Sequence, residues 1–156
     1  MIEIDIPGFG PVVIEHLVFD FNGTLAEDGK LCEGVRDRLI ALSKDVQIHI
    51  LTADTFNMAR DELKGIDCRI TITQGENHDI LKEEYVKSLG PENVVSLGNG
   101  NNDRRMLRIT RIGIAVCLKE GCAIDAIKNA DILVTSSIDA LDFLSNKDRL
   151  KATLRF

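Results

Sequence analysis

The stretch FDFNGTL near the start of the chain combines groups that can react with or bind a phosphate. Its aspartate, Asp20, ends an apolar run, and an aspartate carboxylate can attack phosphorus to form a covalent intermediate. Gly23 lets the backbone approach a ligand closely, and the Thr24 hydroxyl can bond the transferred oxygens. Aspartate and glycine are also common turn residues, so this pattern by itself is more typical of an ordinary turn.

Two further positions could complete a phosphate site. Thr52 offers a hydroxyl at the end of an apolar run, and Ala53 and Asp54 open a helix whose backbone amides attract anions. Asp54 is also a candidate helix N-cap, which is the simpler interpretation of this segment. Lys82 lies early in an amphipathic segment, where it could neutralise an anionic intermediate or lie in solvent beside two glutamates.

The segment GNGNND forms a third polar cluster after an apolar run. Gly98 and Gly100 permit a loop that bulkier residues do not tolerate, and Asp103 faces the site from the start of the next helix. Mg²⁺ would take oxygen ligands from Asp20, from a backbone carbonyl and from this loop.

The elements that must position these clusters alternate between strand and helix patterns from Val12 to Leu144, as in a parallel sheet covered on both faces. Strands are expected at Ile2–Ile6, Val12–Phe21, Val46–Leu51, Cys68–Ile72, Val94–Leu97, Ile112–Val116 and Ile132–Val134. Helices are expected at Val35–Lys44, Thr55–Gly65, His78–Gly90, Asp103–Ile109, Cys122–Asn129, Asp139–Leu144 and in the amphipathic tail. Because such sheets place their sites at the carboxyl ends of strands, one pocket can collect all three clusters.

Size and composition indicate one globular domain over residues 1–156, with an N-terminal hairpin at 1–15, a core at 16–145 and a C-terminal helix at 146–156. A chain of this length can bury roughly 70% of its unfolded surface. The net charge of −6 argues against nucleic-acid binding, and no apolar run approaches the ~20 residues of a membrane helix.

The four cysteines, Cys32, Cys68, Cys117 and Cys122, form no metal or redox spacing, so we expect reduced core thiols in a cytoplasmic protein. The histidines His16, His49 and His78 form no ligand cluster, and His49 is expected to hydrogen-bond within the fold.

The order and spacing of the motifs resemble the haloacid dehalogenase (HAD)-like phosphohydrolases, above all the phosphorylation domain of P-type ATPases. DFNGT is similar to that domain's D-K-T-G-T, TAD to its T-G-D, KEEYVKSLG to its lysine helix and GNGNND to its G-D-G-x-N-D. The resemblance covers roughly residues 16–145. It implies an α/β fold with a three-layer Rossmann-like core, in which helices flank a parallel sheet.

The resemblance also implies a role for each matching residue. Asp20 would be the phosphorylated nucleophile, Lys82 would stabilise the charged intermediate, and Asp103 would orient the metal shell. The implied catalytic set is Asp20, Asn22, Thr52 and Lys82; the phosphate-binding set is Asp20, Gly23, Thr24, Thr52, Ala53 and Lys82; the Mg²⁺ set is Asp20, Asn22 through its backbone carbonyl, Asn99 and Asp103.

The chain departs from phosphatases of this superfamily at two positions, where Asn22 and Asn99 replace the usual acids. An amide cannot act as a general acid or base, and it brings no charge to a metal, so we expect slow turnover and weak Mg²⁺ binding. A non-enzymatic phosphate-binding or regulatory module derived from the ATPase domain therefore stays an alternative.

The segments between Thr24 and Thr52 and between Thr52 and Lys82 are too short for a cap domain. Leu25–Gly34 could form a short flap, and a neighbouring subunit of a homo-oligomer could close the open site. The leading prediction is a cytoplasmic, Mg²⁺-dependent phosphohydrolase that acts on a phosphorylated substrate.

Overall fold

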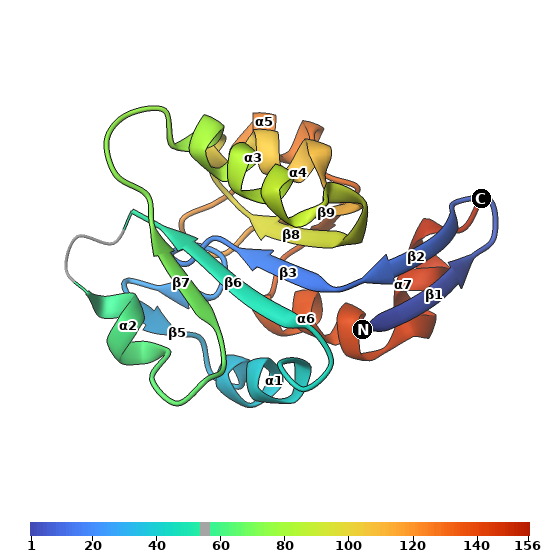
Figure 1. Ribbon diagram of the computed structural model, residues 1–156, viewed down its shortest axis with the longest axis horizontal. Coiled ribbons are helices and arrows are strands. Elements are labelled where there is room, and N and C mark those ends of the chain that lie inside the picture. The colour runs from blue at the N-terminus through green and yellow to red at the C-terminus, as the bar shows by residue number, and fades with distance from the viewer. Residues whose placement is uncertain (54–56) are drawn as a thin grey trace.

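A computed structural model describes residues 1–53 and 57–156 and contains a six-stranded parallel sheet at its centre (Figure 1). The strand order is β10-β9-β8-β3-β6-β7. These strands are β3 (His16–Phe19), β6 (Gln47–Thr52), β7 (Arg69–Ile72), β8 (Val94–Gly98), β9 (Ile112–Val116) and β10 (Ile132–Val134). In the central strand β3, Leu17, Val18 and Phe19 are all buried, because strands of a parallel sheet are covered on both faces.

Helices cover both faces of this sheet, which confirms the predicted three-layer α/β fold. One layer holds α3 (His78–Leu89), α4 (Arg104–Ile109) and α5 (Ile124–Lys128). The other face is covered by α1 (Val35–Leu42), α2 (Met58–Glu62) and α6 (Ser137–Ser145), as Figure 1 shows. Short 3₁₀ helices at Pro91–Asn93 and Asn101–Asp103 precede β8 and α4.

Each face of the sheet has its own packed core. The core beneath α3 and α4 contains Val18, Leu51, Val86 and Met106, whereas the larger core on the opposite face extends to α1, α6 and the N-terminal hairpin. Fully burying a side chain of this kind stabilises the fold by roughly 1.5–3 kcal/mol. The two cores fix the helices on either side of the sheet edge at which the polar clusters lie.

The N-terminal hairpin consists of β1 (Ile2–Ile6) and β2 (Gly10–Ile14), which pair antiparallel outside the main sheet. The prediction of one strand over Val12–Phe21 is wrong, because the chain passes from one sheet to the other at Glu15. The backbone of this residue bonds to Asn93 and Gln47, whereas β2 pairs with β1.

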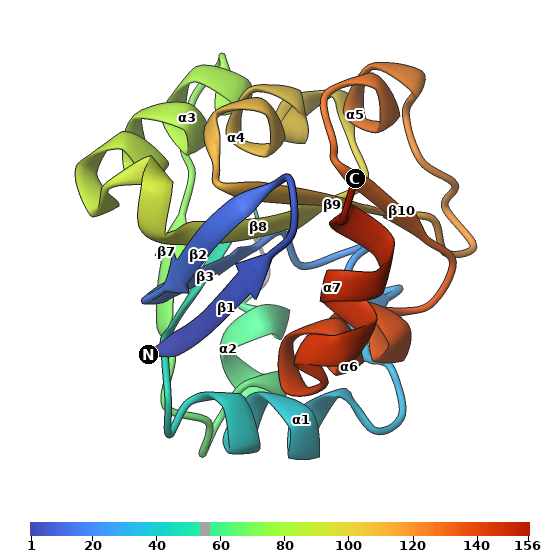
Figure 2. The same ribbon diagram turned by 90° about the vertical axis from the view of Figure 1, so that its right-hand side faces the viewer.

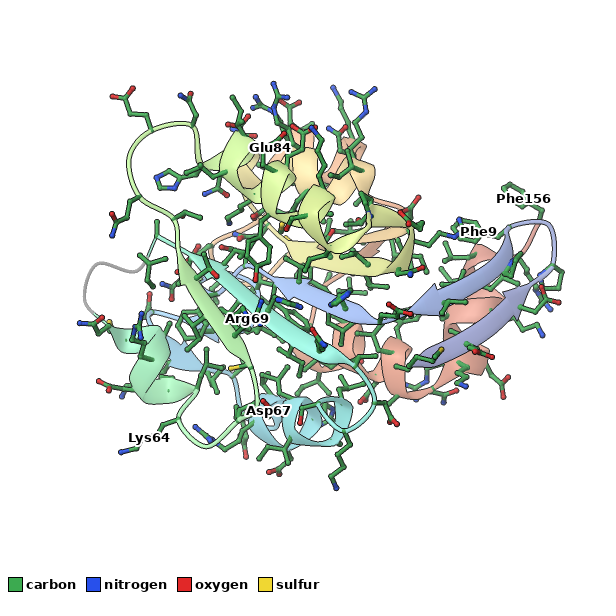
Figure 3. The ribbon with its side chains drawn as sticks, in the orientation of Figure 1. Phe9, Lys64, Asp67, Arg69, Glu84 and Phe156 are labelled. Carbon is green, nitrogen blue, oxygen red and sulfur yellow. The ribbon has the colours of Figure 1, made fainter. Side chains whose placement is uncertain are left out.

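The C-terminal helix α7 (Lys147–Leu154) packs beside β1, as Figure 2 shows from the hairpin side. Its Leu150 is fully buried, and the Phe156 N–H donates to the Pro7 carbonyl at 3.0 Å. Figure 3 shows Phe9 and Phe156 at this same end of the molecule, far from the carboxyl ends of the parallel strands. The C-terminus is thereby fastened to the turn of the N-terminal hairpin.

The structure adds detail to one local prediction and changes the bounds of several helices. The flap at Leu25–Gly34 contains a small hairpin of β4 (Ala26–Glu27) and β5 (Lys30–Leu31). Helix α6 begins earlier than predicted because the Ser136 hydroxyl caps it by accepting from the Ile138 and Asp139 N–H groups. Helix α2 is shorter than predicted, and the proposed N-cap Asp54 lies outside the described residues.

The cysteines were expected in the core, but each of the four thiols is only partly buried. Cys32 and Cys68 pack against the edge of the larger core rather than within it. Within the described residues, every helix is too short or too polar to cross a bilayer.

Candidate active site

Asp20 lies at the carboxyl end of β3, where its N–H donates to the Leu97 carbonyl of β8 at 2.9 Å. The loop after it is compact because the Phe21 carbonyl accepts from the N–H groups of Thr24, Leu25 and Ala26. Gly23 has φ 81°, a left-handed conformation that favours glycine. Central strand and tight loop together fix where the Asp20 carboxylate points.

Lys82 is fully buried and lies between two carboxylates. Its Nζ donates to Asp20 Oδ1 at 2.9 Å and to Asp103 Oδ1 at 2.6 Å, and its side chain is 1% exposed. The alternative of a lysine in solvent is therefore wrong. Helix α3 directs Lys82 inward beneath the site while its glutamate neighbours remain nearer solvent.

Burial and charge shift the ionisation of this triad. Burial, helped by the neighbouring Asp103 carboxylate, raises the pKa of Asp20 to about 6, although Lys82 opposes the shift. Burial alone would lower the pKa of Lys82, but Asp20 and Asp103 together raise it above its ordinary value. Lys82 is therefore a permanent cation, whereas Asp20 changes its charge in the weakly acidic range.

Asp103 is also fully buried, and protein donors bind both of its oxygens. Besides the contact with Lys82, its Oδ2 accepts from the Asn99 and Gly100 N–H groups at 2.9 Å each. A Cβ atom on Gly98 would lie 2.5 Å from the Asp103 Cγ, which explains the glycine at this position. In this arrangement Asp103 orients Lys82 and the loop after β8.

The two asparagines at the predicted acid positions make structural hydrogen bonds. Asn22 Oδ1 accepts from the Gly29 N–H at 2.8 Å and so fastens the β4–β5 hairpin beside the site. Asn99 Nδ2 donates to the Gly121 carbonyl at 3.3 Å, which links the loop after β8 to the loop after β9.

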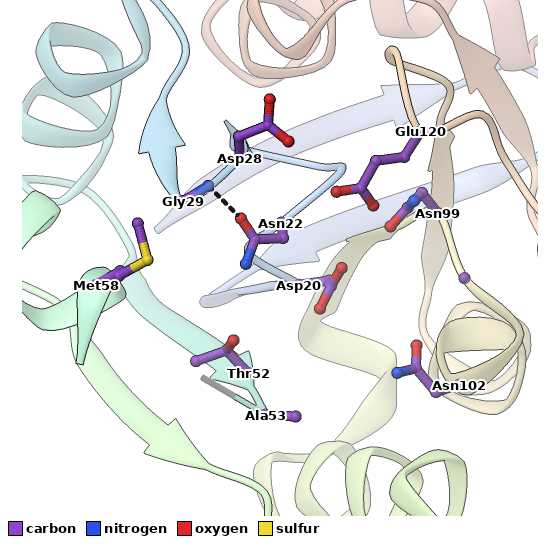
Figure 4. A pocket seen from close by; sticks show the side chains of 11 residues that line it. Asp20, Asn22, Asp28, Gly29, Thr52, Ala53, Met58, Asn99, Asn102 and Glu120 are labelled. Atoms are coloured by element: carbon purple, nitrogen blue, oxygen red, sulfur yellow. Dashed lines mark hydrogen bonds between the residues drawn. The ribbon is translucent and has the colours of Figure 1, made fainter. Parts of the chain in front are cut away.

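A cavity of about 540 Å³ opens at the carboxyl edge of the sheet (Figure 4). Of the predicted site residues, the cavity is lined by Asp20, Asn22, Thr52, Ala53 and Asn99; Gly23, Thr24, Lys82 and Asp103 are not in its wall. Thr24 is buried on the side of Asp20 that faces away from the cavity, and its hydroxyl donates to Asp20 Oδ2 at 3.5 Å.

Sequence reasoning missed other residues in the cavity wall, notably Asp28, Met58, Asn102 and Glu120. Asp28 belongs to the β4–β5 hairpin, and Glu120 precedes Gly121 in the loop after β9. The glycine after Glu120 signals a turn, but nothing in the local sequence indicates that this turn reaches the site.

The histidines lie outside this cavity. As predicted, His49 hydrogen-bonds within the fold, with its Nε2 3.1 Å from His16 Nδ1 and its Nδ1 2.9 Å from the Tyr85 hydroxyl. Burial, with the nearby His16, lowers the pKa of His49 to about 4, so the ring stays neutral at neutral pH.

Comparison with solved structures defines the class of fold. A protein assigned to the HAD family of hydrolases in Streptomyces avermitilis superposes with a TM-score of 0.68 at 17% identity, over 84% of each chain. The 3-deoxy-D-manno-octulosonate 8-phosphate phosphatase of Moraxella catarrhalis, solved with magnesium, phosphate and KDO, has a TM-score of 0.70 at 18% identity, over 91% of this chain and 94% of that one. The predicted HAD-like fold is thus confirmed, and the closer resemblance to the ATPase domain stays a prediction.

A sequence relative places the chain more narrowly. The protein MJ0073 of Methanocaldococcus jannaschii is 42% identical over 75 residues, which are 48% of this chain and 81% of that protein. The chain belongs to the same family as MJ0073. No family model matches it.

Proposed function

We propose that this protein is a magnesium-dependent phosphohydrolase that forms an aspartyl phosphate on Asp20. The observation that carries the proposal is a buried lysine in contact with a strand-end aspartate that lines an open cavity. A carboxylate with a raised pKa and a specific charge partner in a cleft is typical of a catalytic group. The phosphatase of the same fold that was solved with magnesium and phosphate supports this choice of reaction.

In the first step, an Asp20 oxygen attacks the phosphorus of a phosphate ester. The Asp20 O–P bond forms, the bond from phosphorus to the alcohol oxygen breaks, and the leaving oxygen takes a proton from solvent. In the second step, water attacks phosphorus, releases inorganic phosphate and regenerates the carboxylate. The Lys82 ammonium, 2.9 Å from Asp20, offsets the negative charge in both steps.

Several groups around Asp20 can hold the phosphoryl oxygens. Thr52 lines the cavity at the end of β6, and the Thr24 hydroxyl lies next to the Asp20 carboxylate. We assign oxygen binding to the Thr52 hydroxyl and the Ala53 backbone N–H, which line the cavity. The Gly23 N–H already donates to the Ala26 carbonyl at 2.7 Å, and Thr24 is buried behind Asp20. Such preformed donors favour the transition state, in which charge on these oxygens is redistributed.

The residues present fit a hard cation. The available donors are the Asp20 carboxylate, the Asn22 backbone carbonyl and the Asn99 side-chain oxygen, an all-oxygen set that suits Mg²⁺. Among the described residues, no group of three or more His, Cys, Asp or Glu is arranged as a metal site, so amide and backbone oxygens make up most of this donor set. Mg²⁺, when bound, would neutralise charge on the phosphoryl group.

We expect turnover to be slow. Asn22 cannot donate or accept a proton as a general acid or base, and its oxygen already accepts from Gly29. Leaving-group protonation and water activation then depend on solvent.

The test is hydrolysis of 4-nitrophenyl phosphate with Mg²⁺ by wild type, Asp20→Asn and a matched control, Asp5→Asn, at an exposed position of the remote hairpin. Activity that is lost in Asp20→Asn and kept in Asp5→Asn supports the proposal. Equal residual activity in all three proteins would assign the hydrolysis to a contaminant.

The non-enzymatic alternative is favoured by the two amides, which leave the site without its usual acids. Beryllofluoride binding, measured by calorimetry, separates the two functions. Asp20-dependent binding of beryllofluoride without any Asp20-dependent hydrolysis would indicate a phosphate-binding or regulatory module.

A further inference from the structure

Glu120 brings a carboxylate into the candidate active site from the loop after β9, and the resemblance to the family assigns this residue no role. The loop follows β9 and turns sharply, with the Gly121 N–H donating to the Leu118 carbonyl at 2.9 Å and Gly121 at φ 79°. Glu120 lies at the tip of this turn and lines the cavity, and Figure 4 shows its side chain pointing toward Asn99 and Asp20.

Asn99 binds this turn through the residues that follow Glu120. Its Nδ2 donates to the Gly121 carbonyl at 3.3 Å, and its own carbonyl accepts from the Ala123 N–H at 2.8 Å. An aspartate at position 99 could not donate to the Gly121 carbonyl and would repel it. The Asn99 side chain brings no charge to the site, but its amide fixes the turn that carries Glu120.

The Glu120 carboxylate also reaches the loop of the nucleophile. A Cβ atom on Gly23 would lie 2.7 Å from Glu120 Oε2 and closer still to Asn99 Nδ2. The space left open by this glycine is thus where the carboxylate and the amide converge. It adjoins Asn22, whose backbone carbonyl is a proposed Mg²⁺ ligand.

No protein cation neutralises this carboxylate within the part of the chain that the structure describes. Neighbouring Lys119 instead forms an ion pair with Glu27, its Nζ 3.1 Å from Glu27 Oε2, which anchors the turn to the β4–β5 hairpin. The arrangement holds an unpaired negative charge at the rim of the cavity, on the Asn99 side.

We propose that Glu120 supplies the cation site with the negative charge that Asn99 lacks. The inference rests on the proposed function, because it concerns the same Mg²⁺ site. Cation affinity depends on the charge of the ligands, so a site with Asp20 and Glu120 attracts Mg²⁺ more strongly than a site with Asp20 alone. In this proposal the second carboxylate of the site comes from the loop after β9 and not from the loop after β8.

The experiment uses Mn²⁺ as the probe and measures free Mn²⁺ by electron paramagnetic resonance, with Mg²⁺ as competitor and no substrate. Wild type is compared with Glu120→Gln and with Glu3→Gln, which removes the same charge at an exposed position on the remote hairpin. We expect Glu120→Gln to weaken Mn²⁺ binding by about 10- to 100-fold, as for other groups that support a metal site, and Glu3→Gln to leave it unchanged.

A charge exchange tests the compensation directly. Because an acid at position 99 would restore the missing charge, Asn99→Asp combined with Glu120→Gln should recover part of the affinity lost in Glu120→Gln alone. Asn99→Asp alone should instead disturb the turn, since two carboxylates would then converge over Gly23.

The outcomes separate this inference from the proposed function. Equal Mn²⁺ affinity in wild type and Glu120→Gln overturns the inference, and Asp20-dependent hydrolysis in the same preparation leaves the phosphatase standing. Absence of Mn²⁺ binding by wild type overturns the cation site altogether. If Glu120→Gln weakens Mn²⁺ binding but no Asp20-dependent hydrolysis is found, Glu120 belongs to the cation site and the proposed phosphohydrolase activity is wrong.

Discussion

The charge of Asp20 at a given pH is decided by its surroundings. Burial and the Asp103 carboxylate favour the neutral acid, Lys82 favours the anion, and the resulting pKa is about 6. Only the anion is a nucleophile, so in the metal-free protein the nucleophilic fraction of Asp20 falls as the pH drops through this value, and a bound cation would favour the anion.

We therefore predict that the metal-free protein titrates Asp20 with a midpoint near pH 6, neutral below it and ionised above it. The measurement is a carboxyl ¹³C NMR titration of wild type, with Asp20→Asn identifying the resonance. A midpoint near about 4, the ordinary value for aspartate, would contradict this account of the site.

Lys82 lies between the Asp20 and Asp103 carboxylates and donates to both, which makes it a structural as well as a chemical residue. Replacing it by glutamine leaves Asp20 and Asp103 facing each other without a counter-charge. Removing one partner of a buried ion pair typically destabilises a protein by about 3–5 kcal/mol.

We predict a loss of this size in the free energy of unfolding of Lys82→Gln, measured by urea denaturation at neutral pH. The matched control is Lys87→Gln on the same helix, because the Lys87 side chain is 49% exposed and its ion pairs lie at the surface. Such surface pairs contribute about 0–1 kcal/mol. Equal losses in the two variants would show that Lys82 does not hold the carboxylates together.

Among the elements, the β4–β5 hairpin is closely tied to the chemistry. Asn22 Oδ1 accepts from Gly29 at the turn, and Glu62 of α2 accepts from the Leu31 N–H at 3.0 Å. The hairpin is thus held from both sides next to the cavity. A carboxylate at position 22 could accept the same N–H while also restoring a general acid and base.

We predict that Asn22→Asp speeds breakdown of the phosphoenzyme, because general acid–base catalysis contributes about 10²- to 10⁴-fold. Acid-quench measurement of the phosphoenzyme lifetime checks this. Asn22→Ala serves as the comparison, since it loses the Gly29 contact without adding an acid and should not shorten the lifetime. An unchanged lifetime in Asn22→Asp would mean that the amide is not what slows the reaction.

At the scale of the whole molecule, parallel strand order explains why much of the site was predictable. Asp20, Thr52 and Gly98 each follow or end a parallel strand, and the pairing of β3 with β6 and β8 brings those ends to one edge. Glu120 was not predictable, because its approach depends on a turn fixed by a long-range Asn99–Gly121 contact. The strands of the β4–β5 hairpin were also not predicted, and the turn between them is bonded to Asn22, which lies outside the hairpin in the sequence.

The two segments in which a cap domain would be inserted add no second domain. The first contributes β4, β5 and α1, and the described part of the second contributes α2 and β7. Among the described residues, no second domain covers the cavity, and closure by a neighbouring subunit stays a prediction.

This openness predicts weak selection by substrate size. We expect kcat/KM for 4-methylumbelliferyl phosphate and for 4-nitrophenyl phosphate to agree within about tenfold. An enclosed pocket discriminates by about 1–3 kcal/mol for even one methylene group, whereas an open rim leaves room for the larger ester. Light scattering on the same samples gives the oligomeric state. Strong rejection of the larger ester by an oligomer, relieved on dilution to the monomer, would show instead that a neighbouring subunit closes the site.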